Sequence, residues 1–129
     1  MNLVKQEEEF GCAVACAAMI LNRSYIDVRQ DFENDFGKRG VPLNNLIEYI
    51  GAHGYSAIKK KPLFANHKNS MDAELLKPFA EAHLIEYMPQ FDAKDSHVVV
   101  MDDGGRMFCP SGTDVDFGYK IRAVVGFYR

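Results

Sequence analysis

The chain has 129 residues, of which 47% are hydrophobic and 26% are charged, and its formal net charge at pH 7 is −3. This length and composition predict a single soluble globular domain over residues 1–129. The absence of a broad basic surface argues against nucleic-acid binding. No apolar run approaches the roughly 18 residues that a membrane span needs, so we expect no membrane association.

The N-terminus and the cysteines bear on the cellular compartment. Residues 1–10 are acidic and do not have the charge pattern of a secretory signal peptide. Three cysteines are an odd number for a disulfide framework in a chain without an export signal. We therefore expect reduced cysteines and a cytoplasmic protein.

The first half of the chain is predicted to be helical. The first helix is rich in Ala, Met and Leu and should be mostly buried. The second is expected to be capped by Asp27 and to stop at Gly37. The third has Pro42 near its first turn, a position that proline tolerates. The predicted helices cover residues 12–22, 27–36 and 43–53.

After Gly54 the pattern changes to strands. Asp102-Asp103-Gly104-Gly105 separates two of them and predicts a hairpin turn. A short helix over 71–82, kinked at Pro78, is expected before the strands that form the sheet. The predicted strands cover residues 55–60, 83–88, 97–101, 106–109 and 121–128. Helices followed by an antiparallel sheet indicate an α+β domain.

Cys12 is the candidate nucleophile. It follows Gly11 at the predicted start of the first helix, where the helix dipole and unpaired N–H groups favour a thiolate. Small neighbours, Ala13 and Ala15, leave room for a substrate. The alternative is that Cys12 is a small core residue, as free cysteines commonly are.

Gln6 and His97 are candidate partners of Cys12. Attack on an acyl carbon creates an oxyanion, and the Gln6 amide could stabilise it together with the Cys12 N–H. A nucleophilic cysteine also needs a base that is near in space. We expect His53 and His67 to face solvent and His83 to be a partly buried strand residue. His97, at the start of a β-branched run, is then the natural base.

The stretch from Gln6 to Leu21 resembles the opening of C39-family peptidases, in which a Gln precedes a Cys-Gly-x-x-Cys-x-x-Met pattern. The spacing from Gln6 to Cys12 matches, and so does Cys16 four residues later. The segment from Gly40 to Gly54 resembles the family's next helix, and Ser96-His97-Val-Val-Val resembles its histidine strand. The ordered set covers nearly the whole chain.

This resemblance implies a papain-like fold, in which N-terminal helices carrying the cysteine pack on a C-terminal antiparallel sheet carrying the histidine. It implies Cys12 as nucleophile, His97 as base and acid, and Gln6 as oxyanion donor, with no cofactor. Cys16 would be a buried helix residue. Ala13 replaces the family's Gly after the cysteine, which is a mild departure.

The third triad member is the larger departure. The family places an Asp before a Pro on the strand after the histidine, and here Cys109 precedes Pro110. Without a carboxylate, nothing anionic holds the histidine tautomer. Asp95, Asp114 and Asp116 are alternative carboxylates. Cys109 also raises a different hypothesis, a zinc site formed with Cys12, Cys16 and His97.

Three functions follow from these residues. The first is a cysteine peptidase that hydrolyses peptide or isopeptide bonds after small residues, as in the C39 family. The second is another acyl-transfer enzyme on the same fold, a deamidase or an acyltransferase. The third is a catalytically degenerate module that only binds peptides, which the missing Asp favours. A peptide or protein is the expected partner in each.

Overall fold

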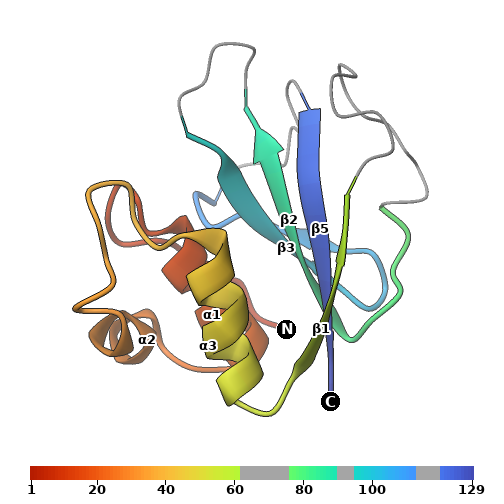
Figure 1. The fold of residues 1–129 in the computed structure, drawn as a ribbon, viewed down its shortest axis with the longest axis horizontal. Coiled ribbons are helices and arrows are strands. Elements are labelled where there is room, and N and C mark those ends of the chain that lie inside the picture. The colour runs from red at the N-terminus through yellow and green to blue at the C-terminus, as the bar shows by residue number, and fades with distance from the viewer. Residues whose placement is uncertain (62–75, 90–94, 113–119) are drawn as a thin grey trace.

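The computed structural model describes residues 1–61, 76–89, 95–112 and 120–129. Three helices lie together on one side of a five-stranded antiparallel sheet, whose strand order is β1-β5-β2-β3-β4 (Figure 1). The helices are α1 (Cys12–Leu21), α2 (Tyr25–Asp31) and α3 (Leu43–Ala52). The strands are β1 (Ser56–Lys60), β2 (Ala82–Met88), β3 (His97–Asp102), β4 (Met107–Phe108) and β5 (Lys120–Tyr128). The predicted α+β order is confirmed.

Helix α1 is the centre of the helical layer. Every residue from 13 to 20 is buried, because α2, α3 and the sheet surround the helix. Its many alanines keep the helix thin and let it pack closely against β3. Cys16 Sγ lies 3.5 Å from the Val98 carbonyl and donates to it. The helix ends at Leu21, and the left-handed backbone of Asn22 lets the Arg23 N–H bond the Ala18 carbonyl at 3.0 Å.

Helix α2 is shorter than predicted, and its start was assigned to the wrong residue. It begins at Tyr25, because Ser24 Oγ accepts a hydrogen bond from the Asp27 N–H and is the N-cap. It ends at Asp31 and does not extend to residue 36, although Phe36 still packs against the core. Helix α3 agrees with its prediction to within one residue.

The sheet is buried on both faces at its centre. On the helix side, Val98 and Val100 pack in the same cluster as α1. On the opposite side, Val99, Met101 and Cys109 belong to a second cluster. Successive strand residues point to opposite faces, so neighbouring β3 residues serve different layers. This alternation decides which side of the sheet each functional side chain occupies.

The predicted hairpin is confirmed, and the predicted helix before β2 is not. Asp102 Oδ1 accepts hydrogen bonds from the Gly104 and Arg106 N–H groups and shapes the turn between β3 and β4. Residues 76–81 form turns and bends, and β2 begins at Ala82, so no helix reaches residue 82. The rest of that prediction, residues 71–75, lies outside the described residues, as does His67.

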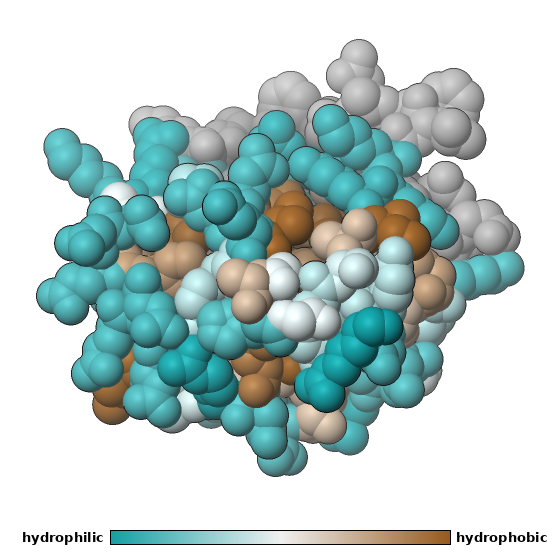
Figure 2. Space-filling model, turned by 60° about the horizontal axis from the view of Figure 1, so that its bottom comes forward, coloured by the Kyte–Doolittle hydropathy of each residue, from teal (hydrophilic) through white to brown (hydrophobic). Residues whose placement is uncertain are grey.

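Polar residues dominate the face shown in Figure 2, where hydrophobic residues form small separate patches. Among the helices of the described ranges, none is long and apolar enough to cross a membrane. The hydrophobic side chains are instead concentrated in the two clusters on either side of the sheet.

His83 is fully buried, more than the sequence suggested. Its Nε2 accepts hydrogen bonds from the Phe79 N–H (2.9 Å) and the Ala80 N–H (3.1 Å). Nε2 therefore carries no proton, and Nδ1 donates to the Met101 carbonyl at 3.2 Å. Burial lowers the pKa of His83, because a protonated ring would be poorly solvated there.

We predict that His83 makes the fold sensitive to acid. Its pKa lies below the ordinary 6.5 in the folded state, so the unfolded state binds more protons as the pH falls. Stability should therefore be lost as the pH decreases through 6.5. His83→Phe leaves three backbone groups unpaired and should cost on the order of 3 kcal/mol at pH 7.5.

Urea denaturation at pH 7.5 and 5.5 checks both expectations. The wild-type protein should lose more stability between these values than His83→Phe does. Equal losses in the two proteins would mean that His83 does not contribute to the acid sensitivity.

Candidate active site

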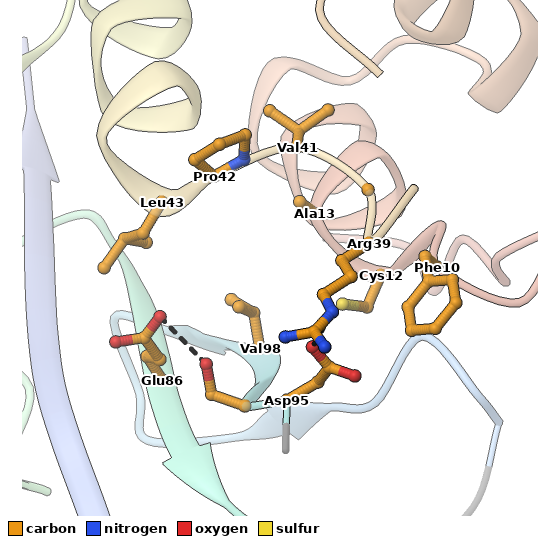
Figure 3. Close-up of a pocket in the computed structure, with 12 residues that line it drawn as sticks. Phe10, Cys12, Ala13, Arg39, Val41, Pro42, Leu43, Glu86, Asp95 and Val98 are labelled. Atoms are coloured by element: carbon orange, nitrogen blue, oxygen red, sulfur yellow. Dashed lines mark hydrogen bonds and ion pairs between the residues drawn. The ribbon is translucent and has the colours of Figure 1, made fainter. Parts of the chain in front are cut away.

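Cys12 is the first residue of α1 and lines a cavity of about 190 Å³ between the helical layer and the sheet (Figure 3). The side chain is half-buried, whereas residues 13–20 of the helix are buried. Two polar pairs face it across the cavity: Ser96 Oγ donates to Glu86 Oε2 at 3.2 Å, and Arg39 Nε lies 3.4 Å from Asp95 Oδ1. The lining residues are Phe10, Cys12, Ala13, Arg39, Gly40, Val41, Pro42, Leu43, Glu86, Asp95, Ser96 and Val98.

The loop that leads to Cys12 is fixed by Glu8. One carboxylate oxygen of Glu8 accepts from Tyr25 Oη and from Arg29 Nε, each at 2.7 Å. The hydrogen bond from Tyr25 and the ion pair with Arg29 lower the pKa of Glu8 despite partial desolvation. The Gly11 N–H bonds the Glu8 carbonyl at 3.1 Å and closes the turn before α1. Sequence reasoning missed Glu8, whose only signal was its position between Gln6 and Cys12.

Gln6 braces the same loop. Its side-chain Nε2 donates to the carbonyls of Glu8 and Glu9, both at 3.0 Å. Its Oε1 is buried without a hydrogen-bond partner among the described residues. Both amide protons are therefore committed to the loop. In the predicted oxyanion role, Gln6 would have to release one of these two bonds.

His97 is the first residue of β3 and lies beside Cys109. Its Nε2 is 3.6 Å from Cys109 Sγ, and its ring packs edge-on against Tyr87 with centroids 5.6 Å apart. Burial lowers the pKa of His97, so the ring is neutral at pH 7. Among the described residues, no hydrogen bond joins His97 to Cys12.

Cys12 instead lies against the residue after His97. A hydrogen bond from the Val98 N–H favours the Cys12 thiolate, as do the N–H groups of Ala13 and Cys12 itself. Burial is the larger effect and raises the pKa of the Cys12 thiol above its ordinary value. The sequence-based expectation of a thiolate was thus wrong for the resting site, because desolvation outweighs the helix terminus.

The candidates for the third triad member differ in whether they contact His97. Cys109 contacts His97, as the position of the family's Asp implied. Asp95 pairs with Arg39 at the cavity, and Asp114 and Asp116 lie outside the described residues. The zinc hypothesis is not supported, since within the described ranges no three His, Cys, Asp or Glu side chains are arranged to hold a metal ion.

Gly40 positions the loop that forms the other wall of the cavity. Its φ is +84°, a conformation that side chains rarely adopt, and a Cβ there would collide with the Phe10 carbonyl oxygen. Phe10 and Gly40 both line the cavity. The close approach therefore locks the loop between α2 and α3 onto the segment that ends at Cys12.

No family model and no curated protein matches this chain. A solved structure does match it: the crystal structure of a double glycine motif protease from an AMS/PCAT transporter, in complex with the leader peptide. The match has a TM-score of 0.62 and covers 98% of this chain and 89% of that one, at 19% identity. The chain has the fold of a C39 peptidase. The predicted papain-like architecture is confirmed, and at this identity the likeness concerns the fold.

We predict that iodoacetamide labels Cys12 slowly at pH 7 and that the rate rises only as the pH passes the ordinary pKa of a free thiol, about 8.5. The reason is that the thiolate is the reacting form and burial disfavours it. Labelling is located by mass spectrometry. The same chain in urea is the control, and its Cys12 should react faster at pH 8. A folded protein that reaches half its maximal rate well below pH 8 would contradict this.

We predict that Gly40→Ala destabilises the protein on the order of 3 kcal/mol, because it adds a collision to backbone strain. Two other glycines distinguish the effect of the collision from that of the backbone strain. Gly54 has φ +96°, and an added Cβ would meet nothing within 4 Å, so Gly54→Ala should cost only about 1 kcal/mol. Gly51 lies in α3 with open space around it, so Gly51→Ala should stabilise by up to about 1 kcal/mol.

Denaturant titrations measure these three changes, and Cys12 labelling measures the effect on the cavity. Only Gly40→Ala should alter the labelling rate. Equal stability losses for Gly40→Ala and Gly54→Ala would show that the contact with Phe10 is unimportant.

Proposed function

We propose that the protein is a cysteine peptidase that cleaves peptides at small residues, with Cys12 as nucleophile and His97 as general base. The observation that carries this proposal is the placement of Cys12 at the start of a buried helix, lining a cavity beside the first residues of β3. The C39 peptidase fold supports it.

The neutral state of both groups favours general-base catalysis over a resting ion pair. Burial raises the Cys12 pKa and lowers the His97 pKa, so each is uncharged at pH 7. During attack, Cys12 Sγ would bond to the substrate carbonyl carbon while its proton passes to His97. His97 would then protonate the leaving amine, and water would hydrolyse the thioester. Hydrogen bonds of this kind often tighten only when substrate binds.

The oxyanion would be stabilised at the helix terminus. The Cys12 N–H belongs to the first turn of α1, where N–H groups lack partners within the helix. The Gln6 amide would be the second donor after exchanging one loop carbonyl for the oxyanion. This exchange costs one hydrogen bond in the resting loop and is compensated only when negative charge develops.

The cavity favours a small substrate residue. Its volume of about 190 Å³ is below the range of pockets for drug-sized ligands, and Ala13 and Gly40 add little side chain to its walls. The matching protease is named for a double glycine motif and was solved with a leader peptide. We therefore propose a peptide with a Gly-Gly-like pair before the cleaved bond.

A peptide-binding module without catalysis is the second candidate. Its support is specific: Cys109 occupies the place of a carboxylate, and the Cys12 thiol is protonated at rest. Such a protein would retain the cavity and bind Gly-Gly peptides without cleaving them.

We predict that the wild-type protein cleaves peptides containing Gly-Gly and that Cys12→Ala and His97→Ala each lower the rate at least about a hundredfold. Mass spectrometry of the products distinguishes the functions. A new N-terminus after the glycines indicates a peptidase, whereas ammonia release from glutamine indicates a deamidase.

Gly51→Ala is the matched control, since this residue lies away from the cavity and should leave cleavage unchanged. Saturable binding of the same peptides with no product from any variant would instead establish the binding module.

A further inference from the structure

We propose that Cys109 is the positioning residue of His97 and fixes its tautomer through its sulfur, in the place where a carboxylate would otherwise stand. The proposal rests on the peptidase function proposed above. The contact that supports it is the 3.6 Å separation of Cys109 Sγ and His97 Nε2.

The fold places Cys109 beside His97 with little freedom. It directly follows β4, which pairs with β3 through Val100–Phe108 and Met101–Met107. The side chain is 6% exposed and packs in the cluster on the face away from the helices. The ring of His97 lies on the same face, against Tyr87 of that cluster.

The turn after Cys109 is tied to the loop that leads to Cys12. The Gln6 N–H donates to the Pro110 carbonyl at 2.8 Å, and the Gly112 N–H donates to the Cys109 carbonyl at 2.9 Å. The backbone around Cys109 is thus held by the same residue whose side chain braces the segment before Cys12. The position of Cys109 relative to the nucleophile is set by this bond.

The hydrogen bonds of Cys109 bear on the tautomer of His97. Cys109 Sγ lies 2.9 Å from Ser111 Oγ, close enough for a hydrogen bond between the thiol and the hydroxyl. When the thiol proton points to Ser111, the sulfur lone pairs are left to accept from His97 Nε2–H. Nδ1 then carries no proton and is the ring nitrogen able to accept one.

A thiol at this position sets the geometry through hydrogen bonding. A carboxylate at the same place would also stabilise the imidazolium that forms during attack. His97 should therefore be correctly oriented as a base, while its protonated form is only weakly stabilised. It follows that Cys109→Asp should increase the basicity of His97. A side chain without lone pairs should leave the His97 proton shared between the two ring nitrogens.

The test uses the full-length protein with three substitutions at this site. Cys109→Val preserves volume and removes hydrogen bonding, Cys109→Ser retains a donor and acceptor, and Cys109→Asp adds a charge. Long-range 1H–15N NMR spectra report the protonation of each ring nitrogen of His97 against pH. Cleavage of a Gly-Gly peptide is followed in parallel, and thermal unfolding confirms that each variant is folded.

We expect the proton to sit on Nε2 in the wild type and in Cys109→Ser, and to be shared between the two nitrogens in Cys109→Val. In Cys109→Asp, the His97 pKa should rise by at least about one unit, with about tenfold or greater gain in the cleavage rate. Ser111→Ala should move the tautomer towards that of Cys109→Val.

The two proposals fail in different ways. A His97 tautomer and pKa that are unchanged in Cys109→Val and Cys109→Asp overturn the role of Cys109, whatever the activity. A tautomer that changes as expected, with no cleavage in any variant, supports the positioning role and contradicts the peptidase function.

Discussion

The packing of α1 against β3 is the constraint on which the rest of the structure depends. The helix is buried from its second residue to its ninth. The hydrogen bond from Cys16 to the Val98 carbonyl fixes the rotation of the helix about its axis and its position on the sheet. Cys12 lies one turn before Cys16, so the same contact places the candidate nucleophile beside the start of β3. Stability and site geometry therefore come from the same interface.

Burial determines the electrostatics of the site. It favours the neutral form of both Cys12 and His97, and the helix terminus does not reverse this for the thiol. Keeping Cys12 and His97 uncharged at rest avoids the cost of placing an unsupported ion pair between two partly buried groups. Charge then develops only during the attack on the substrate, when the oxyanion donors and the substrate itself stabilise it.

The site is also held together by groups outside the catalytic set. Glu8 joins the segment before Cys12 to α2, and Gln6 joins it to the turn after Cys109. Gly40 fixes the opposite wall through its contact with the Phe10 backbone. Phe10 and Gly40 are distant in sequence and lie outside the regular helices and strands, yet both line the same cavity.

The sequence predicted the elements well where periodicity and turn chemistry agreed. The β-branched run after His97 and the turn at Asp102 define β3 and its hairpin, and the structure reproduces both. The start of α2 could not be predicted, because Ser24 and Asp27 are both good N-caps and tertiary packing of Tyr25 chose between them. The pKa of Cys12 was equally inaccessible, since it depends on how deeply the cavity is buried.

Among the candidate site residues, the resemblance to C39-family peptidases anticipated the proximity of residue 109 to His97 but not the engagement of Gln6. A loop hydrogen bond depends on a backbone path that has no periodicity, so no sequence pattern indicates it. The pairs formed by Glu86 with Ser96 and by Arg39 with Asp95 were missed for the same reason.

The most direct test of the account is covalent trapping with a peptide that ends in Gly-Gly and carries a vinyl sulfone in place of the scissile carbonyl. Intact-mass and peptide mapping would locate the adduct. The account predicts a single adduct on Cys12 that forms much more slowly in His97→Ala and that a Gly-Gly peptide competes away. An adduct on Cys109, or a rate on Cys12 that is indifferent to both His97 and the competing peptide, would contradict it.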